Sequence, residues 1–250
     1  MDRVDGSDLA NVFDHAVEIG VPLPLAGSIG MIASAAEALH YAHQATSQDT
    51  GEPLQIIHRD VKPDNILVDW CGSVKIIDFG CAKATVQSEL TRPGIRKGTL
   101  DYMSPEQCLG KPLDLRTDVF SLGVVLYELV TMTRLYADGS DARVMERIAH
   151  EVTRPPSWVN SQVNGPLDLI VLRALEKRPD DRFASIGEMA RALRWWLSRY
   201  GQESTGEAMA SWLSDNLRRH PSVFRVTGTP SAHGELAIRA PSEMRGETKT

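Results

Sequence analysis

The chain has 250 residues, 42% hydrophobic and 24% charged, which is enough for one globular domain of fair size plus a tail. Its formal net charge is −6 at pH 7 and its Lys and Arg residues are scattered, so neither charge balance nor a basic stripe supports nucleic-acid binding. Without C-x-x-C spacing, a signal-peptide core or a run of about 18 apolar residues, we expect a cytoplasmic protein with no membrane segment, disulfide framework or zinc knuckle.

In chain order, the first predicted elements are a helix and two short strands. Small and apolar residues repeat at helical spacing from Gly27 to Ala45 and predict an amphipathic helix. A polar connector follows, and the short apolar runs from Ile56 to Asp69 and from Val74 to Ile77 predict two strands around a turn. Residues 80–105 show no periodicity and predict a long functional loop.

The second half of the chain predicts three helices. Residues 118–131 are apolar nearly all round, so we expect a fully buried helix at the centre of the domain. Residues 185–188 are typical of a capping box, and apolar residues then keep helical spacing to Leu197. Met209, Trp212, Leu213 and Leu217 predict a further amphipathic helix.

Two short motifs in fixed order carry the chemistry. The segment HRDVKPDN at residues 58–65 has the spacing H-R-D-x-K-x-x-N, and DFG follows at residues 78–80, thirteen residues after the asparagine. Taken singly, each polar residue could be a solvated loop residue. Together and in this order, they resemble the catalytic loop and metal-binding motif of the eukaryotic-type (Hanks-type) Ser/Thr protein kinases, in a bacterial-like form.

The resemblance implies roles for the polar residues of both motifs. Asp60 would orient the substrate hydroxyl and accept its proton, and Lys62 would lie beside the transferred phosphoryl group. Asn65 and Asp78 would hold Mg²⁺, or Mn²⁺ in its place, through hard oxygen ligands. In this family a lysine at the position of Lys62 points to Ser/Thr substrates.

The family resemblance also implies contacts for the nucleotide and for the scaffold of the site. ATP is the expected cofactor, with Val4 and Leu67 forming the lower wall of the adenine site. Glu106 would pair with Arg182 as a buried ion pair that mainly fixes geometry. Asp118 would hold the backbone of the catalytic loop, and we also expect structural roles for two aromatic residues of the motifs, His58 and Phe79.

The long loop contains the candidates for regulation by phosphorylation. Kinases with an arginine before the catalytic aspartate are commonly switched by a phosphate that binds this arginine, here Arg59. Thr85, Ser88 and Thr91 are the candidate acceptors, although hydroxyls in a polar loop can be merely solvated. We expect Thr99 to bond to the catalytic residues, and phosphorylation there is an alternative.

Several other residues are interpreted as structural. Trp195 and Trp196 are adjacent on a predicted helix, and we expect one in the core and the other at its boundary. His15, His40 and His43 show no metal-ligand partners and are interpreted as surface or packing residues.

The resemblance predicts the fold and the domain limits. We expect a mainly α, kinase-like C-terminal lobe, with a helical bundle around a buried central helix and short β-hairpins at the catalytic cleft. The expected parts are a hinge remnant (1–9), the lobe (10–200), an accessory amphipathic helix (201–220) and a flexible tail (221–250). The family's N-terminal lobe is expected to be absent, because no G-x-G-x-x-G motif occurs in the sequence.

The predicted function is transfer of the ATP γ-phosphate to Ser or Thr hydroxyls of proteins in signal transduction. Without the phosphate-gripping residues, the isolated chain is expected to have little activity. The expected partners are protein substrates, a second copy of the chain or another kinase chain. An alternative is a non-catalytic, kinase-like docking module.

Overall fold

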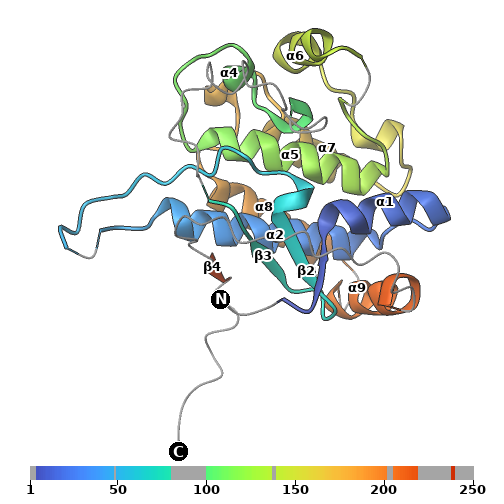
Figure 1. Cartoon of the computed structure of the whole chain (residues 1–250). Helices are drawn as coiled ribbons and strands as arrows, with labels where there is room; N and C mark the ends of the chain where they lie inside the picture. Colours follow the sequence, from blue (N-terminus) through green and yellow to red (C-terminus); the bar gives the residue numbers. More distant parts are fainter. Residues whose placement is uncertain are drawn as a thin grey trace, which may run out of the picture.

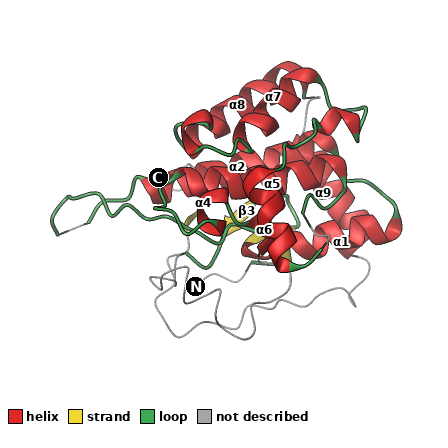
Figure 2. Cartoon of the chain, turned by 90° about the horizontal axis from the view of Figure 1, so that it is seen from above, coloured by secondary structure: helices red, strands yellow, loops and turns green. Residues whose placement is uncertain are grey.

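The computed structural model describes residues 4–47, 49–79, 100–136, 139–201, 205–218 and 238–239. Its elements, in chain order, are β1 (Gly6–Asp8), α1 (Leu9–Ile19), α2 (Leu25–His43), η1 (Pro63–Asn65), β2 (Ile66–Asp69), β3 (Val74–Ile76), η2 (Leu100–Tyr102), α4 (Pro105–Cys108), α5 (Arg116–Thr131), α6 (Asp141–His150), η3 (Pro156–Trp158), α7 (Gly165–Ala174), η4 (Pro179–Asp181), α8 (Ile186–Tyr200), α9 (Thr205–Leu213), η5 (Ser214–Arg218) and β4 (Ile238–Arg239). The described part is therefore mainly helical, with one small sheet (Figures 1 and 2).

Helix α5 forms the centre of the helical body (Figure 1). Every residue of α5 after Arg116 is buried, as expected for a helix that is apolar nearly all round. The predicted central helix over 118–131 is thus confirmed, and it begins two residues earlier than its apolar run. Its first turn carries the buried Asp118, which faces the catalytic loop.

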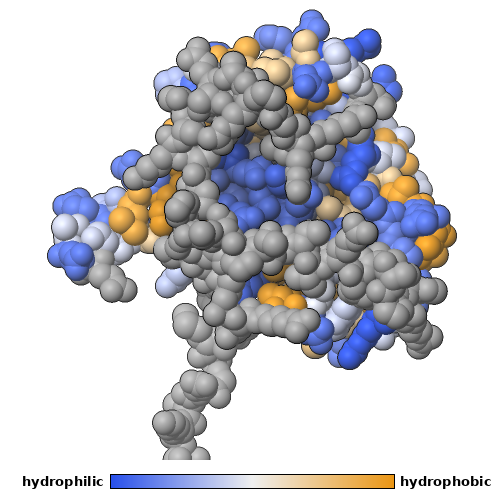
Figure 3. Space-filling model, viewed as in Figure 1, coloured by the Kyte–Doolittle hydropathy of each residue, from blue (hydrophilic) through white to orange (hydrophobic). Residues whose placement is uncertain are grey.

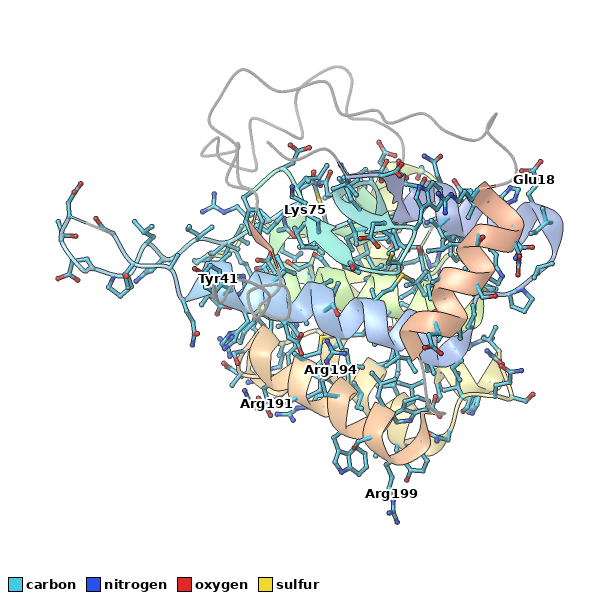
Figure 4. The ribbon with its side chains drawn as sticks, turned by 90° about the horizontal axis from the view of Figure 1, so that it is seen from below. Glu18, Tyr41, Lys75, Arg191, Arg194 and Arg199 are labelled. Atoms are coloured by element: carbon cyan, nitrogen blue, oxygen red, sulfur yellow. The ribbon has the colours of Figure 1, made fainter. Side chains whose placement is uncertain are left out.

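Helices α2 and α8 lie alongside each other (Figure 4), and α2 also packs against α5. Close approach is possible because Gly187 faces His40, where an added Cβ would lie 2.7 Å from the imidazole ring. Arg194 of α8 points into the line of contact and donates to Glu37 at 2.8 Å and to Ser34 at 3.0 Å. By contrast, Arg199 points away from the body.

Helix α8 confirms two sequence predictions and corrects one detail. Trp196 is 3% exposed and Trp195 is 54% exposed, so one lies in the core and one at its boundary. The Ser185 hydroxyl accepts a hydrogen bond from the Glu188 amide at 3.2 Å, as in a capping box. The Glu188 carboxylate, however, accepts from the amide of Ala184 and not from that of Ser185.

The sheet has the order β1-β2-β3-β4, with antiparallel neighbours. Strand β2 starts at Ile66, so the strand predicted from Ile56 is wrong for residues 56–65. The physical reason is that the backbone amides of His58 and Arg59 bind the side chain of Asp118 instead of a neighbouring strand. The predicted turn at residues 70–73 joins β2 and β3.

An arm between α2 and the catalytic loop projects from the helical body (Figures 1 and 2). It corresponds to the polar connector in the sequence. Thr46 and Pro53 form an isolated antiparallel bridge, and Leu54 donates from its amide to the carbonyl of Ala45 at 2.9 Å. The arm therefore folds back on itself before the chain enters the catalytic loop.

The predicted amphipathic helix near the C-terminus is present as α9, which continues into the π-helical η5. The four residues that predicted this helix, Met209, Trp212, Leu213 and Leu217, are all buried in the same core as α2 and α5. Within the expected tail, only 238–239 are described, and they pair with β3. None of the described helices is both long and apolar enough to cross a membrane.

Candidate active site

The backbone of the catalytic loop is fixed by the buried carboxylate of Asp118. Its Oδ2 accepts from the amide of His58 at 2.8 Å, and its Oδ1 accepts from the amide of Arg59 at 2.9 Å. The His43 ring also donates to Oδ2, at 2.8 Å. His43 was interpreted as a surface or packing residue; its ring is buried, and it also fixes the carboxylate that holds the loop.

The side chain of His58 connects the catalytic loop to the segment before Asp78. Its Nδ1 accepts from the amide of Asp60 at 3.3 Å, which leaves Nε2 as the protonated nitrogen that donates to the Ile77 carbonyl at 2.9 Å. The ring also lies against Phe79, with centroids 4.7 Å apart. The two motifs of the sequence are therefore held together by one imidazole ring.

Two polar side chains, those of Lys62 and Asn65, meet at the carboxylate of Asp60. Lys62 Nζ lies 2.9 Å from Asp60 Oδ2, and Asn65 Nδ2 donates to the same oxygen at 3.0 Å and to the Asp60 carbonyl at 2.8 Å. The Asp60 side chain is 44% exposed, so it remains accessible from solvent. Figure 3 shows hydrophilic residues gathered at the centre of this face, where the catalytic loop crosses it.

The oxygen atoms of Asn65 and Asp78 fit a magnesium ion. Asn65 uses its Nδ2 group for Asp60, so its Oδ1 is the atom suited to ligate a cation. The Ile77 amide donates to the Asn65 carbonyl at 3.1 Å, which places the next residue, Asp78, beside Asn65. Among the described residues, no group of three or more His, Cys, Asp or Glu could hold a metal ion alone. The nucleotide phosphates would have to supply further ligands.

The structure describes some of the remaining candidates for nucleotide binding and regulation and not others. Val4 and Leu67 are both half-buried. The strand register sets Leu67 opposite Asp8, so it does not place Val4 and Leu67 directly opposite each other. Arg59 has a left-handed backbone, with φ of 68°. The four candidate hydroxyls of the long loop lie outside the described residues: Thr85, Ser88, Thr91 and Thr99.

Glu106 and Arg182 form a buried, bidentate ion pair with both N–O distances at 2.7 Å. Thr117 also donates to Glu106 at 3.0 Å, and Arg182 donates to the carbonyl of Arg116. Burial alone raises the pKa of Glu106, but the hydrogen bonds and charge of Arg182 outweigh it and hold the pKa below its ordinary value. The pair ties α4 to the segment before α8 and to the start of α5.

One further polar contact of the catalytic loop was not anticipated from the sequence. Gln107 donates from Nε2 to the Arg59 carbonyl at 2.8 Å, and its Oε1 accepts from the Ser104 amide at 2.9 Å. The sequence does carry a signal for the second bond, because residues 104–107 read S-x-x-Q, a capping-box pattern. The bond to Arg59 joins residues 48 positions apart and has no local signal.

This arrangement defines a class of site. A loop aspartate beside a lysine, with an asparagine and a second aspartate as oxygen ligands, is typical of enzymes that transfer phosphoryl groups by positioning and charge neutralisation. Residues 1–194 match the family described as protein kinase domain. The chain therefore belongs to the protein kinase family, and its bacterial relatives place it among the Hanks-type kinases.

Three relatives illustrate the similarity of the chain to bacterial protein kinases. The chain is 36% identical to the tyrosine-protein kinase MasK of Myxococcus xanthus over 234 residues, covering 90% of the chain and 35% of the relative. It is 37% identical to the serine/threonine-protein kinase PknB of Mycobacterium leprae, covering 76% and 28%. It is 34% identical to the serine/threonine-protein kinase Pkn1 of Myxococcus xanthus, covering 96% and 33%. The chain thus spans about a third of the length of these relatives.

Proposed function

We propose that the protein is a Ser/Thr protein kinase that transfers the ATP γ-phosphate to Ser or Thr hydroxyls of proteins in signal transduction. The observation that carries the proposal is the meeting of Lys62 and Asn65 at the carboxylate of Asp60, on a loop held by the buried Asp118. Each of these side chains has a use in phosphoryl transfer. A surface that only docks partners has no chemical need for all of them.

Asp60 acts as the general base of the proposed reaction. Its carboxylate orients the substrate hydroxyl and accepts the proton as the oxygen attacks phosphorus. Lys62 keeps a positive charge 2.9 Å from this carboxylate, close to where the phosphoryl group would pass. The hydrogen bond from Asn65 Nδ2 holds the carboxylate in one orientation, so less reorganisation is needed during transfer.

Asn65 and Asp78 would hold Mg²⁺, and Mn²⁺ could use the same oxygen ligands. When bound, Mg²⁺-ATP supplies the phosphoryl group and part of the charge neutralisation. The contribution of the protein is to fix both oxygen ligands beside Asp60. The backbone bond from Ile77 to Asn65 and the ring of His58 do this.

The proposed preference for Ser and Thr hydroxyls over those of Tyr rests on Lys62. A lysine at this position is typical of kinases acting on Ser and Thr, and two of the three relatives above are named serine/threonine kinases. The third is named a tyrosine kinase. The proposed substrates are therefore proteins with a Ser or Thr acceptor, among them a second copy of this chain or another kinase chain.

The test is phosphate transfer from Mg²⁺-ATP to a protein substrate by the full-length gene product that contains residues 1–250. We expect Asp60→Asn to lower the rate by about 10²- to 10⁴-fold, because the general base is lost. The matched control is Asp64→Asn, an exposed aspartate of the same loop, which should transfer at close to the wild-type rate. Equal rates for the two variants would contradict the role of Asp60.

The alternative function is a kinase-like docking module without catalysis. No transfer by the full-length product, with the fold intact by circular dichroism, would favour this module over the enzyme. We expect residues 1–250 alone to transfer phosphate slowly, because they contain no G-x-G-x-x-G loop to cover the phosphates. Fast transfer by this chain alone would contradict that expectation.

A further inference from the structure

Gln107 connects helix α4 to the catalytic loop across the interior of the protein. Its side chain is only 4% exposed, and Nε2 donates to the carbonyl oxygen of Arg59 at 2.8 Å. The amide orientation follows from its other partner, because Oε1 accepts from the amide of Ser104 at 2.9 Å. With its oxygen committed to a donor, Gln107 can present only its NH₂ group to the loop.

The peptide plane that Gln107 contacts is the one directly before the proposed base. This plane joins Arg59 to Asp60, and both of its polar groups are held. Its oxygen accepts from Gln107 at 2.8 Å, and its N–H donates to His58 Nδ1 at 3.3 Å. The direction of the Asp60 side chain depends on this plane, because the Cα–Cβ bond follows from the backbone torsions.

The backbone at Arg59 needs such support. Its φ of 68° lies in the left-handed region, which residues other than Gly, Asn and Asp rarely adopt. The Asp118 carboxylate binds the amide before this torsion, and Gln107 binds the carbonyl after it. The disfavoured conformation is therefore held on both sides by buried groups from two different helices.

The anchor on the α4 side is itself rigid. Glu106, the neighbour of Gln107, is fixed by the two hydrogen bonds from Arg182. Ser104 accepts from the Gln107 amide at 3.4 Å and is fully buried. The bond from Gln107 to the loop therefore starts from a well-supported helix and not from a mobile side chain.

We propose that Gln107 is a positioning residue for phosphoryl transfer: by holding the Arg59 carbonyl, it fixes the peptide plane that aims the Asp60 carboxylate. This inference rests on the proposed function for its catalytic consequence. The structural half of the inference, that Gln107 holds the loop, can be tested without any activity.

Two substitutions separate the bond to Arg59 from the rest of the side chain. Gln107→Glu keeps an oxygen to accept from Ser104, but in its ionised form it cannot donate to the Arg59 carbonyl. Gln107→Met keeps the length and removes both polar groups, so it serves if a buried carboxylate prevents folding. The control is Ser185→Ala, which removes the cap of α8 but no bond to the catalytic loop.

The first measurement is native-state hydrogen exchange of residues 58–60 in the chain, corrected for global stability from urea unfolding. We expect both Gln107 variants to speed exchange at Arg59 and Asp60 by about tenfold beyond the global effect, because the peptide plane is released. Ser185→Ala should show the global effect alone. If a folded Gln107 variant exchanged its Arg59 and Asp60 amides at the wild-type rate after this correction, the proposal would be overturned.

The second measurement is the kinetics of phosphate transfer by the full-length gene product. A misplaced base should lower kcat by about tenfold or more, with the KM for ATP changed by less than about threefold. A kcat equal to that of Ser185→Ala would overturn the positioning role. No transfer by wild type would contradict the proposed function instead, and the exchange measurement would still decide whether Gln107 holds the loop.

Discussion

The carboxylate of Asp118 accepts a hydrogen bond from the backbone amide of Arg59 at 2.9 Å. Asp118 belongs to the buried helix α5, whereas Arg59 directly precedes the proposed base on the catalytic loop. This bond connects the buried central helix to the site of the proposed chemistry. The stability of the fold and the geometry of the site therefore depend on the same carboxylate.

Asp118→Asn should lower the free energy of unfolding by about 3 kcal/mol, because an amide group replaces the buried carboxylate that three donors shared. Urea unfolding followed by circular dichroism measures this. The control is Asp114→Asn, which removes an exposed ion pair with Arg116 and should cost less than about 1 kcal/mol. Equal losses in the two variants would contradict the anchoring role of Asp118.

Glu106 should make the protein sensitive to acid. Its pKa is lower in the folded state than its ordinary value of 4.5, so the folded state binds fewer protons than the unfolded state in this range. The stabilisation is complete above about pH 4.5 and is lost as the pH falls through the folded pKa. We expect the stability of wild type to fall more steeply below this pH than that of Glu106→Gln.

The measurement is urea unfolding from pH 3 to pH 7, compared between wild type and Glu106→Gln. The variant should be less stable at pH 7, because the charge of Arg182 stays buried without its partner. Parallel pH profiles in acid would show that Glu106 titrates with an ordinary pKa, and the ion pair with Arg182 would then not be a source of acid sensitivity.

Helix α9 should unfold together with the kinase domain and contribute to its stability, although it lies beyond the residues matched by the kinase family. Trp212 is buried in the common core, so Trp212→Ala should cost about 3–5 kcal/mol of unfolding free energy. Trp195→Ala, at a largely exposed position, should change it by about 0.5 kcal/mol or less. If thermal or urea unfolding gave equal losses of unfolding free energy for Trp212→Ala and Trp195→Ala, α9 would not contribute to the stability of the kinase domain.

The parts of the fold that the sequence predicted are those with a local or periodic signal. Residues 118–131 are apolar nearly all round, which predicted a buried helix, and apolar residues repeated at helical spacing marked α2, α8 and α9. The proposed site residues were found because HRDVKPDN and DFG resemble, in order and spacing, the catalytic loop and metal-binding motif of the Hanks-type kinases. Their roles stay predictions, as do the domain limits and the cytoplasmic location.

The parts that the sequence did not predict depend on contacts between distant segments. The hydrogen bond between His43 and Asp118 was not predicted, because the two residues are 75 positions apart. The predicted strand began too early, at Ile56, because the apolar pair Ile56 and Ile57 gives no sign that a buried carboxylate would capture the amides that follow it. The role of Gln107 was not predicted for the same reason, because its bond to Arg59 forms only when α4 packs against the loop.

The central claim is that Asp60 serves a Ser/Thr protein kinase. The most direct measurement is phosphoamino-acid analysis of protein labelled from [γ-³²P]ATP with Mg²⁺ by the full-length gene product, beside its Asp60→Asn variant. We expect phosphoserine or phosphothreonine with wild type and a loss of about 10²-fold or more of this label with the variant. Label on tyrosine, or label that persists in Asp60→Asn, would contradict the claim.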